Sequence, residues 1–309
     1  MANPRTLLIT HPDCLQHVLT EHAESPDRLR SVLAAINASP ALASMAQRLA
    51  TAATDAELTL AHPLALIQQL QRLEPLAGAI MIDPDTYMSP GTVHAARLAA
   101  GACIEATRLV LNGEADRVFC AIRPPGHHAE IDAAMGFCFF NNVALGAITA
   151  LAHADIRRIA ILDFDVHHCN GTVDIFKDDD RVLVCSSFQQ DYYPNRYLDY
   201  ENSHIVATPL TPGTRSATFR RLIEDQWLPA VNRHQPDLIF ISAGFDAHKD
   251  DPLAQIELEV DDYRWITQLI KDLAEQHCGG RIISTLEGGY HLKALGDCVR
   301  VHLETLIES

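Results

Sequence analysis

The sequence has few basic residues for the number of acidic ones. Its 309 residues include 24 lysines and arginines against 40 aspartates and glutamates, which gives a net charge of −16. Proteins that bind nucleic acid directly need a basic surface to displace counterions from the phosphates, so this composition argues against direct nucleic-acid binding. An acidic surface is compatible with cationic substrates, such as lysine-rich tails or polyamines.

Patterns for export, membrane insertion and paired-cysteine chemistry are also missing. The first residues lack the basic and long apolar stretches of a signal peptide, and no apolar run approaches the length of a membrane span. None of the eight cysteines forms a C-x-x-C pair, which argues against a zinc ribbon or a thioredoxin motif. We therefore expect a reduced, cytoplasmic protein with no membrane association.

Apolar runs typical of buried strands alternate with helical patterns along the chain. Strands are expected at 6–10, 78–82, 118–122, 158–163, 182–186, 204–209, 237–242 and 281–286, and helices from 27, at 41–53, 56–73, 90–112, 141–152, 217–231 and 261–276, and at the C-terminus. This alternation predicts a mainly parallel sheet of about eight strands in a three-layer α/β/α architecture. No linker, repeat or low-complexity segment interrupts the chain, so we expect residues 1–309 to form a single domain.

Polar side chains occur where four of these strands end. In a parallel sheet the carboxyl ends of the strands share one edge, so we expect these side chains to meet in one crevice. They are His127 and His128 after the strand at 118–122, Asp163, Asp165 and His167 at and after the end of the strand at 158–163, Asp246 after the strand at 237–242, and Tyr290 after the strand at 281–286.

Three of these residues form a candidate metal-binding triad, Asp165, His167 and Asp246. Asp163, Asp165 and His167 are spaced two apart, and side chains two apart on an extended segment point the same way. Three nitrogen and oxygen ligands with one open position are typical of a catalytic zinc site, whereas structural zinc sites are closed and usually rich in cysteine. Such a metal lowers the pKa of its bound water towards about 7 and polarises a substrate carbonyl.

The adjacent histidines and the tyrosine are candidates for proton transfer. One of His127 and His128 can act as general base on the metal-bound water, and the other as acid or electrostatic stabiliser. Asp163 and Asn170 are candidates to fix their tautomers, and a carboxylate raises imidazole basicity more than an amide, which would separate the two pKa values. Tyr290 follows a Gly-Gly turn and could donate to a developing oxyanion, although in isolation a tyrosine there is more typical of a helix cap.

Five motifs surround these residues: Arg123-Pro-Pro-Gly-His-His128, Gly136-Phe-Cys138 with Asn141-Asn142, Asp163-Phe-Asp-Val-His-His168 with Asn170-Gly-Thr172, Ser242-Ala-Gly-Phe-Asp246 and Glu287-Gly-Gly-Tyr290. Over about residues 20–300, and in the same order, they resemble the motifs of the zinc-dependent histone deacetylase family. The class II and bacterial amidohydrolase branch is the most similar. This resemblance implies the arginase/deacetylase fold and hydrolysis of an N-acetyl amide, most often on lysine.

The resemblance also implies roles for the candidate catalytic residues. Asp165, His167 and Asp246 would bind one zinc ion per chain. His127 and His128 would be the acid/base pair, and Tyr290 would polarise the substrate carbonyl.

Substrate and potassium sites follow from the same resemblance. Phe137 and Tyr193 would be walls of an acyl-lysine tunnel, Asp85 and Thr86 would lie on its rim, and Gly136 and Leu253 would also border the substrate, an acetylated lysine or an acetylated polyamine. Family members bind a further, structural potassium ion near the zinc strand. The residues that match this site, several through backbone oxygens, are Asp163, Asp165, His167, Ser186 and Ser187.

The sequence departs from the family pattern at three positions. Cys169 stands where the family usually has glycine, and Phe188 replaces a common histidine. The segment Pro194-Asn-Arg-Tyr197 lacks the family's Pro-Gly-Thr-Gly, so the loop beside the tunnel is expected to differ in shape. None of these departures removes a metal ligand or the tyrosine.

Three alternatives to an acyl-lysine deacylase are considered. An arginase-type hydrolase with two manganese ions needs further bridging carboxylates, but the positions concerned are Cys169 and His248. A polyamine-specific branch carries glutamate where this chain has Leu253, which weakens that alternative, although Asp250, Asp251 and the acidic surface keep it open. Intact His127, His128 and Tyr290 argue against a silent acyl-lysine binding module. The natural substrate, the acyl length and the oligomeric state are left open.

Overall fold

The computed structural model describes residues 5–198, 200 and 202–308. Its main sheet has eight strands in the order β2-β1-β5-β10-β9-β6-β7-β8, and every neighbouring pair is parallel. The strands are β1 (Thr6–Thr10), β2 (Ala46–Leu49), β5 (Arg117–Cys120), β6 (Ile159–Asp163), β7 (Val182–Gln189), β8 (Ile205–Leu210), β9 (Leu238–Ala243) and β10 (Ile282–Leu286).

The four central strands are buried along their whole length. Residues of β5, β10, β9 and β6 are all inaccessible to solvent, as expected for parallel strands covered on both faces. Their sequences are nearly continuous apolar runs, such as Ile159–Leu162 and Leu238–Ile241. Because every strand runs in the same direction, the loops at their carboxyl ends share one edge of the sheet.

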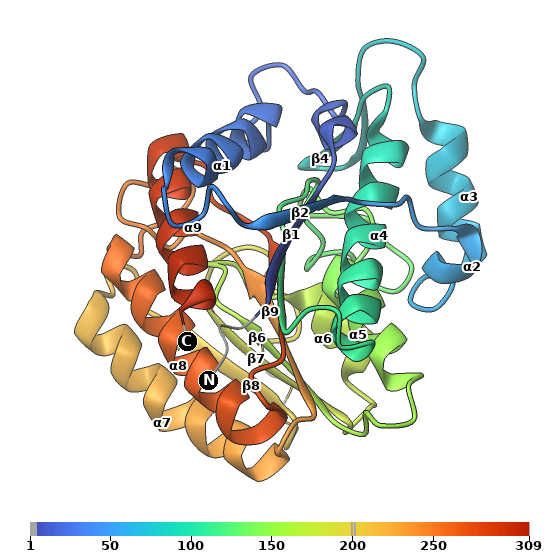
Figure 1. The fold of residues 1–309 in the computed structure, drawn as a ribbon. Helices are drawn as coiled ribbons and strands as arrows, with labels where there is room; N and C mark the ends of the chain where they lie inside the picture. The colour runs from blue at the N-terminus through green and yellow to red at the C-terminus, as the bar shows by residue number, and fades with distance from the viewer. Residues whose placement is uncertain (1–4, 199, 201, 309) are drawn as a thin grey trace.

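Helices cover both faces of the sheet (Figure 1). On one face lie α1 (Pro26–Ala38), α7 (Ser216–His234), α8 (Val260–Cys278) and α9 (Leu292–Ile307), and on the other lie α4 (Thr92–Leu111), α5 (Asn142–Leu151) and α6 (Asn170–Phe176). The first group packs in the order α7-α8-α9-α1, and α4 packs against α5. The predicted three-layer α/β/α architecture is therefore confirmed. Among the described residues, no helix has the length and apolar character that crossing a membrane requires.

Three predictions of secondary structure were wrong in whole or in part. The expected helix at 41–53 is instead the edge strand β2, whose four residues are all exposed, so no apolar alternation marks it. The expected strand near 78–82 exists as β3 (Ile80–Asp83), but it pairs antiparallel with β4 (Thr86–Met88) in a separate two-stranded sheet. The expected helix at 56–73 is interrupted at 59–63 and gives α2 (Asp55–Leu58) and α3 (Leu64–Leu73), with Pro63 as the N-cap of α3, because proline is not tolerated in a helix interior.

Candidate metal centre and active site

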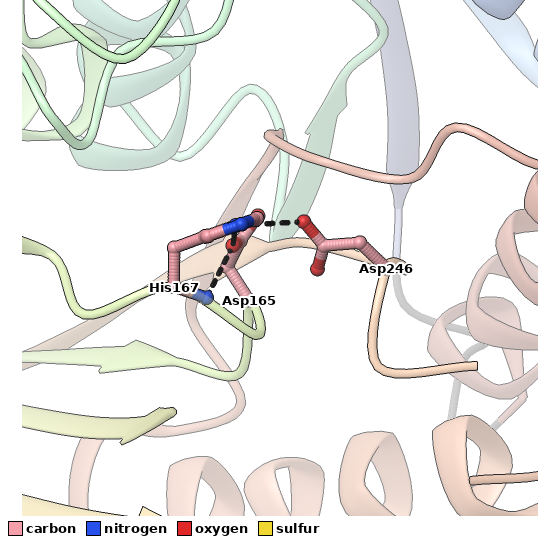
Figure 2. Close-up of side chains that lie close together, drawn as sticks. All are labelled: Asp165, His167 and Asp246. Atoms are coloured by element: carbon pink, nitrogen blue, oxygen red, sulfur yellow. Dashed lines mark hydrogen bonds and ion pairs between the residues drawn. The ribbon is translucent and has the colours of Figure 1, made fainter. Parts of the chain in front are cut away.

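The loops after the four central strands bring the predicted residues together at the carboxyl edge of the sheet. Asp165 and His167 follow β6, and Asp246 follows β9, which pairs with β6 in register. Potential ligand atoms of these three buried residues all lie within 4.8 Å of one another. In Figure 2 the imidazole of His167 faces both carboxylates, with Nδ1 lying 3.0 Å from Oδ1 of Asp165 and 3.1 Å from Oδ2 of Asp246.

Backbone donors hold the two carboxylates in place. Asp165 accepts hydrogen bonds from the backbone N–H groups of His167 at 2.9 Å and Gly288 at 2.8 Å, and Oδ1 of Asp246 accepts one from Val166 at 2.8 Å. The approach of residue 288 requires glycine, because a Cβ there would lie 2.1 Å from Oδ2 of Asp246. The Gly-Gly turn therefore allows the backbone itself to contact both acidic ligands.

The electrostatics of this cluster favour a cation between the three side chains. Burial raises the pKa of the Asp246 carboxyl, and the charge of Asp165 raises it further. Burial alone lowers the pKa of His167, but the two carboxylates beside its ring raise that pKa well above its usual value. Oδ2 of Asp246 is buried and lies 3.1 Å from Nδ1 of His167, but no described residue donates a hydrogen bond of acceptable geometry to it. A buried carboxylate oxygen without a hydrogen-bond donor, beside a second carboxylate and an imidazole, fits a divalent metal ion.

No third carboxylate extends this cluster within the described residues, where the group of potential metal ligands consists of Asp165, His167 and Asp246. Cys169 is fully buried at the N-terminus of α6, and Nδ1 of His248 accepts a hydrogen bond from the backbone N–H of Asp250 at 3.2 Å. The geometry of the described residues therefore suits one metal ion rather than the bridged pair of an arginase-type site.

The adjacent histidines have different partners. Nδ1 of His127 lies 3.0 Å from Oδ2 of Asp163, and Nδ1 of His128 lies 2.6 Å from Oδ1 of Asn170. Burial lowers the pKa of His127, but the carboxylates of Asp165 and Asp163 outweigh it and raise that pKa to about 10. Burial and the neighbouring imidazoles of His127 and His167 lower the pKa of His128 well below its usual value. One ring therefore favours the charged form, and its neighbour favours the neutral form.

A narrow cavity of about 180 Å³ opens onto this centre. Five of the six residues predicted to bind substrate line it, namely Asp85, Gly136, Phe137, Tyr193 and Leu253, together with His128, His167, Tyr192 and Tyr290. Thr86 lies behind the wall, where its hydroxyl accepts a hydrogen bond from the backbone N–H of Phe137 at 3.0 Å and donates one to Asp85 at 2.8 Å.

Tyr192 is part of the cavity wall that the sequence reasoning missed. Its ring stacks on that of His167, with centroids 5.7 Å apart and planes at 24°, and its hydroxyl donates a hydrogen bond to the Leu253 carbonyl. The only signal for it is the pair of adjacent tyrosines at 192 and 193, of which only Tyr193 was assigned a role.

Buried charged groups that were not predicted from the sequence hold the Tyr290 loop in place. Arg28 of α1 donates a hydrogen bond from Nε to the Gly289 carbonyl at 2.6 Å, and its guanidinium lies 4.8 Å from the centre of the Tyr290 ring. Glu24 accepts hydrogen bonds from Arg28 at 3.2 Å and from Arg123 at 2.6 and 2.8 Å. All three charged side chains are inaccessible to solvent, so this network links the loops after β5 and after β10 to the segment that leads into α1, well away from water.

Asp251 faces inward rather than towards the mouth of the cavity. Its Oδ2 accepts hydrogen bonds from the backbone N–H groups of Tyr290 at 2.7 Å and His291 at 3.3 Å, and only 6% of its surface is exposed. Asp251 was one of the acidic residues that kept the polyamine alternative open, but its carboxylate holds the tyrosine loop instead. Burial raises the pKa of Tyr290 well above its usual value, which keeps the phenol protonated and able to donate.

The residues expected to bind potassium lie on two adjacent strands, β6 and β7, and in the loop that follows β6. Asp163 of β6 is the register partner of Ser186 on β7, and Ser187 follows. Oδ1 of Asp163 accepts a hydrogen bond from the backbone N–H of Asp165 at 3.0 Å, which links this strand pair directly to the triad.

Comparisons with known proteins agree with this geometry. The family pattern described as "Histone deacetylase domain" matches residues 22–306. The histone deacetylase-like amidohydrolase of Pseudomonas aeruginosa is 38% identical over 276 residues, which cover 87% of this chain and 72% of that protein. The mouse polyamine deacetylase HDAC10 is 34% identical over 320 residues, which cover 97% of this chain and 46% of that protein.

The crystal structure of the HDA15 HD domain has a TM-score of 0.93 to this chain at 31% identity, and the match covers 99% of this chain and 89% of that one. Both the arginase/deacetylase fold and the family resemblance read from the motifs are therefore confirmed. With the match spanning nearly its whole length, the chain belongs to the histone deacetylase family.

Proposed function

We propose that the protein is a zinc-dependent deacylase that hydrolyses N-acetyl or longer N-acyl amides, with acetylated lysine side chains as the main substrate. One observation carries the proposal: His167 of the metal-binding triad, the neutral His128 and the protonated Tyr290 line one narrow cavity, and the charged His127 lies beside them, 3.8 Å from Oδ1 of Asp165. A module that only binds acyl-lysine does not need these proton-transfer groups.

Zinc would be held by one oxygen each of Asp165 and Asp246 and by Nδ1 of His167, with one ion per chain. The buried Asp246 oxygen to which no described residue donates a hydrogen bond supports this assignment. When bound, zinc polarises an amide carbonyl and acidifies water. Asp163, Asp165, His167, Ser186 and Ser187 are proposed to hold a structural potassium ion.

The side chains of the cavity divide the remaining work. Phe137 and Tyr193 enclose the aliphatic stem of the substrate and exclude water, and the Tyr290 hydroxyl donates a hydrogen bond to the carbonyl oxygen. His128 is the ring that can take a proton from the attacking water, because its low pKa keeps it neutral, and it can return that proton to the leaving amine. His127, paired with Asp163, stays charged and stabilises the developing negative charge.

An acetylated polyamine is the second candidate substrate. The net charge of −16 favours a polycation, and the mouse relative is named a polyamine deacetylase. Against this, the apolar side chain of Leu253 lines the cavity and Asp251 is turned inward, so neither offers a carboxylate to a second ammonium group.

The test is a panel of acyl-lysine peptides, acetylspermidine and small N-acetyl amides, assayed with zinc-loaded protein. We expect kcat/KM for the acetyl-lysine peptide to exceed that for acetylspermidine by at least about tenfold, and Leu253→Glu to narrow this ratio by pairing with the second ammonium. A higher rate on acetylspermidine would favour the polyamine alternative. No hydrolysis of any member by zinc-loaded protein would refute the proposed function.

Gly136 gives a test of the packing around His128. Residue 136 has φ +59°, and a Cβ there would lie 2.4 Å from Cδ2 of His128. We expect Gly136→Ala to lower kcat at least about tenfold, because displacing a catalytic group by about 1 Å can cost about 100-fold. The matched control is Gly113→Ala, which has a similar φ of +68° and open space around the position. Similar activity losses in both variants would show that backbone strain, and not contact with His128, is responsible.

A further inference from the structure

A chain of hydrogen bonds runs from the surface to His128. Nδ1 of His128 lies 2.6 Å from Oδ1 of Asn170, and Nδ2 of Asn170 donates to Oε1 of Glu130 at 2.7 Å. The other carboxylate oxygen of Glu130 accepts a hydrogen bond from Nη1 of Arg196. Asn170 and Glu130 are buried, whereas the side chain of Arg196 is half exposed.

Each group in this series of hydrogen bonds determines whether the donor end or the acceptor end of the next group faces it. A guanidinium can only donate hydrogen bonds and a carboxylate can only accept them. Glu130 therefore requires the NH₂ end of the Asn170 amide to face it, which turns the carbonyl end towards His128. Two longer contacts of the same Nδ2, with the His128 carbonyl and with Sδ of Met135, both at 3.3 Å, favour the same orientation.

We infer that Glu130 is a positioning residue that determines which ring nitrogen of His128 carries its proton, and that Arg196 holds Glu130 in the orientation this requires. Facing a carbonyl oxygen, Nδ1 must be the protonated nitrogen. The cavity-facing Nε2 is then left with a free lone pair, as a proton acceptor needs. With the amide reversed, Nε2 would carry the proton and His128 could not act as a base. The catalytic consequence, but not the tautomer itself, rests on the proposed function.

The loop that supplies Arg196 is also fixed at a second point. The Tyr197 hydroxyl donates to Oδ1 of Asp174 at 2.7 Å, and Oδ2 of Asp174 accepts from the backbone N–H of Ile131 at 3.0 Å. This loop begins with Tyr193, whose ring packs edge-on against that of His128 with centroids 5.1 Å apart. The segment 194–197, which departs from the family pattern, is thus tied both to the cavity wall and to the support of His128.

Three variants test this inference through a double-mutant cycle. In Glu130→Gln, the new amide turns its carbonyl to Arg196 and its NH₂ to Asn170, which reverses the Asn170 amide. We expect kcat to fall about 30-fold with KM changed less than twofold, a loss typical of groups that orient a functional histidine. Arg196→Met alone should lower kcat only about threefold, because Glu130 still accepts from Asn170. Adding Arg196→Met to Glu130→Gln should recover most of the loss, because the glutamine carbonyl can then turn to Asn170.

A purely structural ion pair predicts a different pattern, with equal losses in both single variants and no recovery in the double variant. That pattern would overturn the inference. If Glu130→Gln fails to fold, the double variant that carries both Glu130→Gln and Asn170→Asp is used instead. A carboxylate at position 170 accepts from both neighbours, so the inference requires Nδ1 of His128 to be protonated in that variant too.

Long-range proton–nitrogen NMR spectra of ¹⁵N-histidine-labelled protein provide a readout that does not depend on activity. The His128 signals are identified by their absence in His128→Ala. We expect the Nδ1–H tautomer in the wild type and an increased Nε2–H population in Glu130→Gln. A wild-type Nε2–H tautomer, or an unchanged tautomer in Glu130→Gln, would overturn the inference even in an active enzyme. The expected tautomers in a protein that hydrolyses nothing would refute the proposed function and leave the inference intact.

Discussion

Replacing Asp246 by alanine is expected to abolish zinc binding and hydrolysis together. The change removes one of three protein ligands and leaves Asp165 and His167, which are too few to hold the ion in a defined geometry. Groups that only support a ligand already contribute about 10–100-fold to metal affinity or activity, so losing a ligand itself should lower zinc affinity by more than about 100-fold. Chelator competition and zinc content per chain measure this loss.

The thermal stability of the same variant gives a second readout, because zinc should change the melting temperature of the wild type but not that of Asp246→Ala. Without metal, the variant loses the hydrogen bond from Val166 to Asp246, but it also loses a buried carboxyl whose ionised form burial and the charge of Asp165 disfavour, so the two metal-free proteins should melt at similar temperatures. Zinc should then raise the melting temperature of the wild type but not that of the variant. At a free zinc concentration of 100 times Kd, binding adds about 2.7 kcal/mol to the free energy of unfolding. Asp272→Ala, which removes an exposed carboxylate of α8, is the control and should keep the zinc response.

Two outcomes would contradict this account of the metal centre. An Asp246→Ala protein that keeps one zinc ion and its activity would exclude Asp246 as a ligand. A wild-type stoichiometry of two metal ions, with manganese preferred, would support the arginase-type alternative instead.

Tyr290→Phe is expected to lower kcat by about 10²–10³-fold while zinc content and KM stay close to those of the wild type. The ring can keep its edge-on contact with Phe137, whose centroid lies 5.9 Å away, and its place beneath the Arg28 guanidinium. Only the hydroxyl is lost, and with it the donor to the carbonyl oxygen as negative charge develops there. Steady-state kinetics on an acetyl-lysine peptide measure the effect.

Tyr192→Phe is the matched control for this prediction. It removes a hydroxyl from the same cavity, but that hydroxyl already donates to the Leu253 carbonyl. We expect a loss below about tenfold, in line with the loss of one neutral hydrogen bond. If Tyr290→Phe retained as much activity as Tyr192→Phe, the role of Tyr290 in polarising the carbonyl would be excluded.

Local sequence patterns were enough to predict the centre of the fold and which side chains meet at the candidate metal site. The apolar run at Ile159–Leu162 predicts a buried strand, and the residues that follow it at a spacing of two lie where parallel strands end. That geometric rule needs no knowledge of strand order. It therefore predicted that His127, Asp165 and Asp246 lie at one edge of the sheet before any strand pairing was known.

Features that depend on contacts between distant segments could not be predicted in this way. The edge strand β2 has no apolar alternation, and only its pairing with β1 defines it. The count of eight strands was right with one member wrong, because β3 pairs with β4 outside the main sheet. The inward orientation of Asp251 depends on the path of the Tyr290 loop, which is separated from it by 39 residues.

The hydrogen bond between Arg28 and the Gly289 carbonyl joins residues 261 positions apart in the chain. The tyrosine loop is thus held by a side chain that is synthesised 261 residues before it. A nascent chain can form the early strands, but it cannot complete this site until the loop at Gly289 has been synthesised as well. We therefore expect that a chain ending before this loop would lack both Tyr290 and the contact that holds it, and would not hydrolyse acyl groups.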